Sequence, residues 1–415
     1  MCYSLAMDLV ERLSLAAAGA RQDAADTRDR PGAAPPCGMS APRTGQTYRV
    51  GGHEIPIYPA AGPGGRRFPL LKAMLTTVCE RDCNYCSFRG PFDQRRVTFR
   101  PDEMATAFDQ AFRAGWVQGL FLSSGIAGGG VNTQERLIAT AEILRQRFGF
   151  RGYIHLKIMP GAEREQVLRS MRIASRVSIN LEAPNPDRLP ALAPGKSFEG
   201  ELLPPLRWAS EARDPEAAAP RLASSATQFV VGAAGESDLE ILSTVGHVYR
   251  HLGAARVFFQ SFDPIRGTPL ENHPAESPLR QDRLYQASYL LRDYGFEVEE
   301  LPLTQSGNLP LDHDPKAAYA LQALVDHPIE INTAPPELLL RIPGLGPKGV
   351  QRLLAARRHG QLRELTHLRQ LGIVAERAAP YVTLMGRRPR HQLSFLSQLG
   401  DLTRKPSSSH PAPRP

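Results

Sequence analysis

The chain has 415 residues, which is enough for two or three domains with a substantial core. Hydrophobic residues make up 42% and charged residues 22%, as in ordinary folded proteins, and no apolar run approaches the roughly 20 residues of a membrane span. The first stretch, MCYSLAMDLVERL, carries acidic Asp8 and Glu11 and no basic start, unlike a secretory signal. We therefore expect a cytoplasmic protein with no membrane partner.

Positive charge is concentrated near the C-terminus. From Glu330 to the last residue there are 14 Lys and Arg against 5 Asp and Glu, whereas residues 1–329 contain 36 basic and 37 acidic side chains. A neutral body with a basic appendage is typical of proteins that bind polyanions. A solvated arginine-rich tail would give the same count, so charge alone leaves both interpretations open.

The elements begin weakly and then alternate regularly. The first 65 residues predict one amphipathic helix, from Met7 to about Ala25, followed by a flexible connection rich in proline and glycine that contains Cys37. From Leu70 onward, six strand–helix pairs follow. The expected strands are residues 70–78, 117–125, 152–161, 176–184, 224–233 and 255–264. The expected helices are residues 101–115, 133–148, 164–174, 197–213, 237–253 and 278–295.

This alternation predicts the fold class. Several of the strands are near-continuous apolar runs, which is typical of parallel strands buried on both faces. Alternating strands and helices predict an α/β fold with a parallel sheet, and six units fit a partial (βα)6 barrel better than a closed barrel of eight. Functional residues are then expected at the carboxyl ends of the strands.

The pattern changes after Asn308. Residues 311–328 predict a connector helix, residues 331–360 a helix, a tight turn and a second helix, and residues 367–382 a weaker copy of that plan. A tail that starts near Arg387 is expected to be disordered. The predicted domains are an N-terminal helix and flexible segment over 1–65, the barrel over 66–310, a small all-α domain over 311–386 and the basic tail over 387–415.

Three of the five cysteines lie within eight positions. Cys79, Cys83 and Cys86 have the spacing C-x3-C-x2-C. Because cytoplasmic thiols stay reduced, a cluster of this kind favours metal ligands over disulfides. Zinc would need a fourth ligand nearby, whereas a [4Fe–4S] cluster held by three thiolates leaves one iron open for a small molecule. Structural zinc with an unidentified histidine, or unrelated buried thiols, remain alternatives.

The segment also carries Tyr85 just before its last cysteine, and it follows the first strand of a (βα)6 pattern. In these features it resembles the radical SAM superfamily. The resemblance implies a [4Fe–4S] cluster held by the three cysteines, with S-adenosylmethionine (SAM) chelated at the open iron. It also implies a one-electron donor, such as a flavodoxin or a ferredoxin, and cleavage of SAM to methionine and a 5′-deoxyadenosyl radical.

Two further stretches correspond to SAM contacts of that superfamily. Ser123, Ser124 and Gly125 follow the second strand, where the family often has Gly-Gly-Glu, and are candidate contacts for the methionine amino group. The acidic residue of that motif is absent here. The fourth strand ends in candidate ribose or carboxylate contacts, namely Ser178, Asn180 and Glu182. Glycine and serine at strand–helix turns need no ligand, so ordinary turn chemistry is the alternative for each.

The remaining barrel candidates lie on the third and fifth strands. Val230 and Gly232 match the adenine-contacting motif of the fifth strand, with Glu236 out of register. Lys157 ends the third strand and is a candidate contact for substrate or for the SAM carboxylate. A solvated lysine at the rim of a barrel is the alternative.

The stretch LLLRIPGLGPKGVQRLL resembles the helix-hairpin-helix DNA-binding motif. Gly344, Leu345 and Gly346 form its turn, and glycines there let backbone N–H groups approach a phosphate closely. Lys348 and Arg352 follow one turn apart on the same side. Such modules hold backbone phosphates without reading the base sequence. A helical hairpin used for protein contacts is the alternative.

Several longer stretches resemble one subgroup of the superfamily that is assigned to DNA modification or repair. They are LFLSSG, GYIHLK, NLEAPN with LAPGKSFE, GAAGESDLEIL, DRLYQASYLLRDYGF and INTAPPELLLRIPGLG. The resemblance implies DNA as substrate and a uracil-DNA glycosylase-like protein as partner, with Cys37 a candidate hydrogen-atom donor. An RNA substrate such as a tRNA, or a non-catalytic iron–sulfur protein that binds DNA, remain open.

Overall fold

The computed structural model describes residues 2–20, 47–50, 52–61, 67–90, 95–213 and 222–390. They form two compact units: the first comprises the described residues up to Glu236 together with His247–Ser277, and the second comprises Ser237–Gly246 and the described residues from Pro278. The sixth predicted helix therefore belongs to the second unit, whereas the sequence placed the boundary near residue 310. Most of the predicted flexible connection, including Cys37, and the tail from residue 391 lie outside the described residues.

The first unit is built on one eight-stranded sheet whose strands follow chain order. The strands are β1 (Thr47–Val50), β2 (His53–Ala61), β3 (Arg67–Met74), β4 (Gly119–Ser123), β5 (Tyr153–Lys157), β6 (Arg176–Glu182), β7 (Ser224–Val231) and β8 (Arg256–Ser261). β3 to β8 are parallel, and β1 and β2 add an antiparallel extension beside β3. All six predicted strands are confirmed, in an open sheet consistent with a partial barrel.

The sequence did not predict β1 and β2. Proline cannot donate to a strand ladder, so Pro56 and Pro59 argue against a strand in this stretch. In the structure Pro59 pairs with Pro69 of β3, and Ile55 and Ile57 are buried in the core. Burial of these side chains therefore outweighs the two missing N–H donors.

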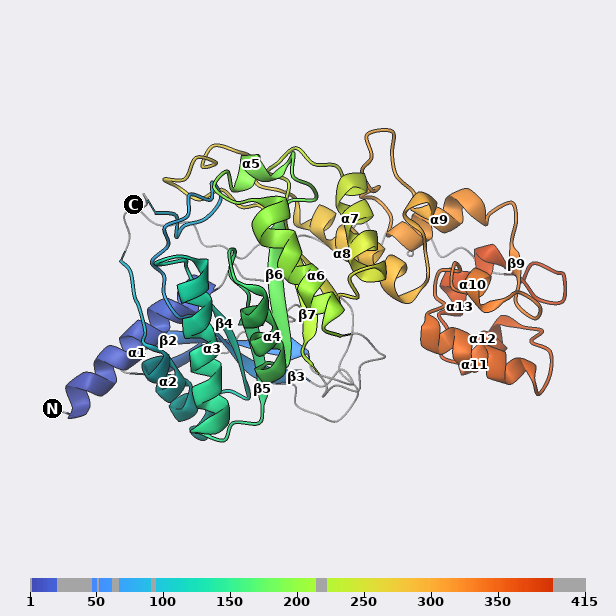
Figure 1. The fold of residues 1–415 in the computed structure, drawn as a ribbon. Coiled ribbons are helices and arrows are strands. Elements are labelled where there is room, and N and C mark those ends of the chain that lie inside the picture. Colours follow the sequence, from blue (N-terminus) through green and yellow to red (C-terminus); the bar gives the residue numbers. More distant parts are fainter. Residues whose placement is uncertain are drawn as a thin grey trace. The chain divides into compact units, whose positions relative to one another are not determined.

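Helices connect the parallel strands (Figure 1). They are α2 (Pro101–Arg113), α3 (Gly130–Gln146), α4 (Arg164–Ile173), α5 (Leu189–Leu192), the π-helix η3 (Phe198–Leu202), α6 (Leu203–Glu211) and α7 (Asp238–Arg250). α2 packs on α3, α3 on α4 and α4 on α6, while α1 (Cys2–Gly19) packs on β2 and β3. None of the described helices is long and apolar enough to cross a membrane.

The start of α2 shows why the sequence is helical there. Pro101 occupies the first turn, where a missing N–H costs nothing, and Glu103 accepts a hydrogen bond from the N–H of Arg100 at 2.7 Å. Met104 and Phe108, one turn apart, are fully buried against the sheet. The cap and the apolar face thus fix both the start and the orientation of the helix.

The parallel strands have two different faces. Leu120, Leu122, Ile154 and Leu156 alternate along β4 and β5 and belong to the core cluster that includes α2 and α3. The residues between them are largely polar although buried; with their neighbours on β3 and β6 they are Lys72, Ser123, His155, Lys157 and Ser178. The strands are therefore buried on both faces, as predicted, but this face is more polar than an apolar run implies. A buried polar face is costly unless it binds something or forms internal hydrogen bonds.

The second unit contains short helices and a minimal sheet. Its elements are α8 (Pro278–Asp293), η4 (Val298–Glu300), α9 (Pro315–Ala323), β9 (Ile329–Glu330), α10 (Pro336–Leu339), α11 (Pro347–Arg357), α12 (Leu365–Gln370), α13 (Ala375–Ala378), η5 (Ala379–Tyr381) and β10 (Val382–Thr383). β9 and β10 are parallel, so the prediction of an all-α domain was wrong in this detail. Strands of two residues give no periodicity that a sequence could reveal.

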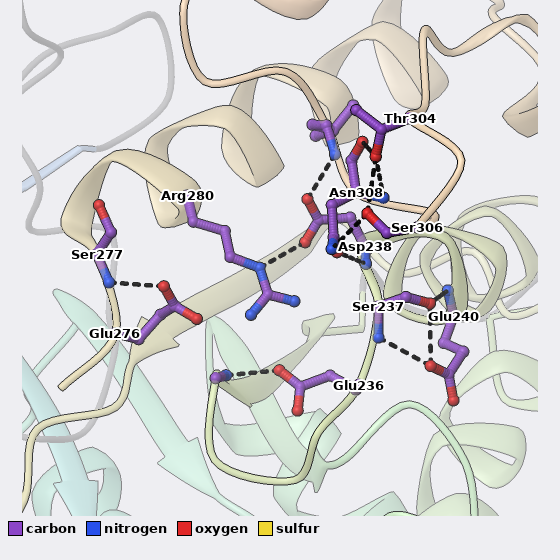
Figure 2. Close-up of polar contacts among 12 residues, drawn as sticks. Glu236, Ser237, Asp238, Glu240, Glu276, Ser277, Arg280, Thr304, Ser306 and Asn308 are labelled. Carbon is purple, nitrogen blue, oxygen red and sulfur yellow. Dashed lines mark hydrogen bonds and ion pairs between the residues drawn. The ribbon is translucent and has the colours of Figure 1, made fainter. Parts of the chain in front are cut away.

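One buried carboxylate organises the start of the second unit (Figure 2). Asp238 is fully buried, accepts a hydrogen bond from Arg280 Nε at 2.8 Å and accepts another from the N–H of Leu309 at 2.8 Å. Its own N–H donates to Asn308 Oδ1 at 3.1 Å. These contacts join α7, α8 and the loop around Asn308.

Candidate functional site

The three clustered cysteines lie in the loop between β3 and α2. Cys83 is buried and Cys79 and Cys86 are half-buried, and all three are reduced. Burial is the main cause that raises the pKa of the Cys83 thiol, and burial together with the neighbouring thiols raises that of Cys86 to about 12. Because iron binds thiolates, cluster binding would release these protons. The loop therefore gathers all three predicted ligands into one electrostatically coupled group.

A site for a single metal ion differs in geometry from a site for an iron–sulfur cluster. Among the residues that the structure describes, no group of three or more His, Cys, Asp or Glu side chains is arranged to hold one metal ion. A [4Fe–4S] cluster instead takes one thiolate per iron, so its ligands stand around a cluster rather than around a single ion.

Gly125 brings the end of β4 against the cysteine loop. Its N–H donates to the carbonyl of Thr76 at 2.7 Å, and the next N–H, of Ile126, points at Cys79 Sγ at 3.4 Å. A Cβ on Gly125 would lie 2.1 Å from the carbonyl oxygen of Val78. The glycine is therefore required by close backbone approach, which is more specific than the turn chemistry that the sequence left open.

Glu80 fixes the glycine-rich segment that follows β4. Its two carboxylate oxygens accept hydrogen bonds from the N–H groups of Gly128 and Gly129, both at 3.1 Å. Both glycines have positive φ, of 74° and 88°. The segment AGGGVN, which departs from the resemblance, thus binds directly to the cysteine loop.

The connection between β6 and η3 clamps the cysteine loop from a second side. The N–H of Asn84 donates to the carbonyl of Leu192 at 2.7 Å. Arg81 donates to the carbonyl of Gly195 at 2.6 Å, and the N–H of Gly195 donates to Asp82 Oδ1 at 3.1 Å. We call residues 189–196 the clamp segment. It binds the loop between Cys79 and Cys86 at three residues, Arg81, Asp82 and Asn84.

The clamp segment ends in a residue that the sequence analysis missed. Lys196 Nζ lies 2.8 Å from Glu182 Oε1, and the two side chains are only 8% and 4% exposed. Burial alone would lower the pKa of Lys196, but the charge of Cys83 as a thiolate and the charge of Glu182 raise it above its usual range. Burial, and then the charge of Glu182, raises the pKa of the Tyr85 hydroxyl well above normal.

Glu182 itself has an unusual backbone. Its φ is +65°, a conformation that residues other than glycine rarely adopt, and the β6–β7 register shifts between Asn180 and Glu182. Strain of this kind is concentrated at functional sites, where surrounding contacts hold it. The bulge ends β6 at the position where the sequence predicted SAM contacts.

Four predicted contacts have a buried polar atom with no hydrogen bond to any described residue. These atoms are Ser124 Oγ, Ser178 Oγ, Asn180 Oδ1 and Glu182 Oε2. Buried polar atoms are nearly always paired, so each exception calls for an explanation. Their position at the carboxyl ends of β4 and β6, beside the cysteine loop, fits a ligand with several polar groups. A ribose or an amino-acid moiety, both present in SAM, has groups of the required kind.

Lys157 and Ser123 lie on the same polar face. Lys157 is 6% exposed at the end of β5, where it pairs in register with Ser178 of β6. Ser123 is 3% exposed at the end of β4. The solvated rim lysine that the sequence left open is therefore not what the structure shows.

The turn after β7 is held by hydrogen bonds of its own. Val230 is buried, and Gly232 has a φ of +94°. The Glu236 carboxylate accepts hydrogen bonds from the N–H groups of Gly232 at 2.5 Å and Ala234 at 3.0 Å. Figure 2 shows Glu236 in the segment that follows the strand. The side chain of Glu276 lies so close to Gly232 that an added Cβ would be 2.3 Å from its carboxylate. Glu236 therefore holds this turn in shape.

In the second unit, the predicted hairpin lies between α10 and α11. Gly344 has a φ of +84°, and its Cβ would lie 2.5 Å from the carbonyl oxygen of Val374 in the second helical hairpin. Gly372 repeats this conformation with a φ of +71°. The weaker copy that the sequence indicated is thus a second hairpin packed on the first.

The polar residues of the hairpin differ in availability. Lys348 is exposed in the first turn of α11, and Arg352 is exposed but donates to the carbonyl of Leu371 at 2.7 Å. Leu345 is only 1% exposed, so its side chain belongs to the core. The backbone of the turn, rather than this side chain, is what a ligand could contact.

A cavity of about 340 Å³ borders the hairpin, lined by Leu345, Gly346, Tyr294 and Lys316 among others. Lys316 donates to the carbonyl of Leu345 and lies 4.6 Å from the ring centre of Tyr294. Burial lowers the pKa of Lys316 to about 7. A lone lysine at the start of a helix gave no signal of this in the sequence.

The geometry of the first unit agrees with a comparison against protein families. Residues 74–214, about one third of the chain, match the family model described as the Radical SAM superfamily. The matched range contains the cysteine loop and the clamp segment. It also contains the four predicted contacts described above whose buried polar atoms lack a hydrogen-bond partner among the described residues. No curated protein matches the sequence.

Several solved structures are similar to part of this chain. The FeFe-hydrogenase maturase HydG from Carboxydothermus hydrogenoformans has 16% identity and a TM-score of 0.44, over 54% of this chain and 51% of its own. Methylornithine synthase (PylB) has 16% identity and a TM-score of 0.42, over 61% and 68%. A radical SAM methyltransferase from Sphaerobacter thermophilus has 14% identity and a TM-score of 0.40, over 59% and 73%. This chain spans about half the length of HydG.

The family match indicates which cofactors the matched domain binds. Radical SAM enzymes bind a [4Fe–4S] cluster and SAM, as the resemblance of the cysteine segment implied. The residues present fit that pair, because three coupled thiols stand beside a group of buried polar atoms that lack protein partners. What the domain acts on is not part of this match.

Proposed function

We propose that this protein is a radical SAM enzyme that modifies or repairs nucleic acid, with DNA as the polymer. The observation that supports the reaction class is that three coupled thiols lie beside the unpaired polar atoms at the ends of β4 and β6. The polymer is supported by the paired glycine hairpins and by the basic C-terminal region.

In the first unit, each group has a defined task. Cys79, Cys83 and Cys86 would hold the cluster, which supplies a 5′-deoxyadenosyl radical from SAM when bound and reduced. The hydroxyls of Ser124 and Ser178 would orient polar groups of SAM, which is a matter of positioning rather than of chemistry. The electron donor in this proposal is a flavodoxin or a ferredoxin.

In the second unit, the hairpin would hold the polymer. The positive φ of Gly344 turns the backbone so that N–H groups at the start of α11 can approach a phosphate, and Lys348 adds a charge that is exposed beside them. A base within a duplex must be flipped out before a radical can reach it, at a cost of a few kcal/mol that is lower for a damaged base. The resemblance adds a uracil-DNA glycosylase-like protein as a proposed partner.

The reaction class is tested anaerobically. The cluster is reconstituted and reduced, SAM is added, and 5′-deoxyadenosine is measured with damaged DNA, undamaged DNA and RNA of matched sequence. We expect deoxyadenosine to form and to increase with one DNA substrate, and Cys83→Ala to abolish it. An increase with RNA alone would reassign the polymer, and no product from a protein with a full cluster would contradict the proposal.

The polymer is tested by salt dependence. The logarithm of DNA affinity should fall linearly with the logarithm of salt concentration, and Lys348→Ala should reduce the slope by about one. Arg147→Ala, which removes an exposed arginine from the end of α3, is the matched control and should leave the slope unchanged. A DNA affinity that does not respond to salt would remove the second unit from the proposal.

A further inference from the structure

The buried pair of Lys196 and Glu182 has no structural need that explains it. Two charges are removed from water, and one of the carboxylate oxygens still lacks a hydrogen-bond partner among the described residues. Apolar residues of similar volume would often be as stable or more so, because desolvation offsets the attraction between the charges. The backbone of Glu182 is also strained, with a φ of +65°. Features that cost stability are concentrated at functional sites.

The position of the pair indicates which group it acts on. Lys196 directly follows Gly195, whose N–H and carbonyl are both bound by the cysteine loop through Asp82 and Arg81. Its charge acts on Cys83 and also on Cys86. The charge of Glu182 acts on Cys83 more weakly than that of Lys196, and it acts strongly on Tyr85. Both charges therefore lie beside the cysteine loop, and that of Lys196 acts the more strongly on Cys83.

We propose that the Lys196–Glu182 pair sets the reduction potential of the cluster. Lys196 is thus a positioning residue for electron transfer, acting through its charge on the thiolates rather than on substrate. The inference rests on the proposed radical SAM function, since it concerns the cluster that this function requires. A nearby positive charge stabilises the electron-rich reduced cluster and so raises its potential, and a negative charge lowers it.

The two residues must then have opposite effects when removed singly. Lys196→Met leaves the buried carboxylate alone, so the potential should fall. Glu182→Gln leaves the ammonium alone, so the potential should rise. The double variant removes both charges and should return close to the original value. A merely structural pair would instead lose cluster in both single variants and would show no opposite shifts.

The experiment is a redox titration of the reconstituted full chain without SAM, followed by electron paramagnetic resonance of the reduced cluster. At a fixed potential near the midpoint, Lys196→Met should lower the ratio of reduced to oxidised cluster about tenfold, equivalent to about 59 mV for one electron. Glu182→Gln should raise that ratio by a smaller factor. Lys196→Arg, which keeps the charge, should restore it.

Ser170→Ala is the control, because it removes a buried, uncharged hydrogen bond outside the cysteine loop and the clamp segment, the 2.8 Å bond to the carbonyl of Gln166. It should leave the potential unchanged. Shifts of Lys196→Met and Glu182→Gln in the same direction, or no shift in proteins with full iron content, would overturn the inference. If Lys196→Met loses its cluster, Glu182→Gln decides alone, and an unchanged or lower potential overturns the inference.

Failure of the proposed function gives a different result. In that case wild-type protein would take up no [4Fe–4S] cluster, or the cluster would form but SAM would not be cleaved. The potentials would still be measurable in the second case, so the two ideas are tested separately.

Discussion

Two ion pairs, one in each unit, use the same chemistry in different ways. In the second unit, Arg341 binds both oxygens of Glu300, at 2.6 and 3.0 Å, and its other N–H groups donate to three backbone carbonyls. All five of its donors are used, and its guanidinium lies 4.3 Å from the ring centre of Phe296. In the first unit, Lys196 and Glu182 form a pair whose carboxylate is only half used.

The difference separates a structural network from a site. A fully satisfied buried network specifies and stabilises one arrangement, whereas a partly satisfied one is unstable unless a ligand completes it. The atoms without partners in Ser124, Ser178 and Asn180 extend the incomplete network along the same ends of β4 and β6. Completeness of hydrogen bonding, more than burial or charge, therefore distinguishes the two regions.

The largest expected effect comes from displacing the cysteine loop, which lies beside the incomplete hydrogen-bond network. Gly125→Ala should abolish cluster binding, because the added Cβ would lie 2.1 Å from the Val78 carbonyl and displace the cysteine loop. Iron and sulfide content after reconstitution measures this. Gly90→Ala, in the same loop, meets nothing closer than 3.4 Å and should bind a full cluster. Full iron content in Gly125→Ala would show that the close approach is unimportant.

The complete network should respond through stability. Arg341→Met leaves Glu300 and three carbonyls without their donor, and should lower the free energy of unfolding of the second unit by about 3 kcal/mol. Hydrogen exchange of α11 measures the loss, and iron content should not change. Arg369→Met, which breaks the exposed pair with Glu376, should cost less than about 1 kcal/mol. Equal losses in both variants would contradict the distinction.

Two buried serines sharpen the comparison within the first unit. Ser178→Ala removes a hydroxyl with no partner, so the unfolding free energy should not fall, while SAM affinity should drop three- to tenfold. Ser170 is equally buried, but its hydroxyl donates to the carbonyl of Gln166 and accepts from Gln134. Ser170→Ala should therefore lower stability and leave SAM affinity unchanged. Denaturant titration and calorimetry of the cluster-loaded protein compare the two.

The last comparison concerns pH in the second unit. Burial holds the pKa of Lys316 near 7 in the folded state, below the ordinary lysine value of about 10.4. Between these values the unfolded chain binds more protons than the folded one, so stability should rise with pH from about 7 to 10. Lys316→Met removes this contribution, so its stability relative to wild type should decrease over that range. A constant difference would indicate an ordinary pKa.

The fold was predictable where local pattern determines structure. Six strands and six helices followed from apolar periodicity and from punctuation by proline and glycine. The exceptions have physical causes: β2 contains Pro56 and Pro59, and β9 and β10 are two residues long. The polar character of the buried face that carries Lys72, His155 and Lys157 was not predicted, because hydrophobic residues on the other face dominate such short segments.

The site was predictable only in part. Ser178 and Asn180 were accessible because they alternate at the end of a strand, which places both on one face. Lys196 was not, because its role depends on Glu182, 14 residues away, and on a clamp that no spacing rule describes. The strained φ of Glu182 arises from a bulge in pairing, and pairing is a tertiary property.

The clamp segment also has a consequence for synthesis. Its hydrogen bonds to the cysteine loop join residues that are 107 to 114 positions apart. At ribosomal rates of about 5–20 residues per second, the cysteines emerge roughly 5–25 s before the segment that holds them. During that interval Cys79, Cys83 and Cys86 are reachable by an iron–sulfur donor and by oxidants alike. The order of the chain thus gives cluster delivery a time window, which closes when β6 and the clamp segment fold onto the sheet.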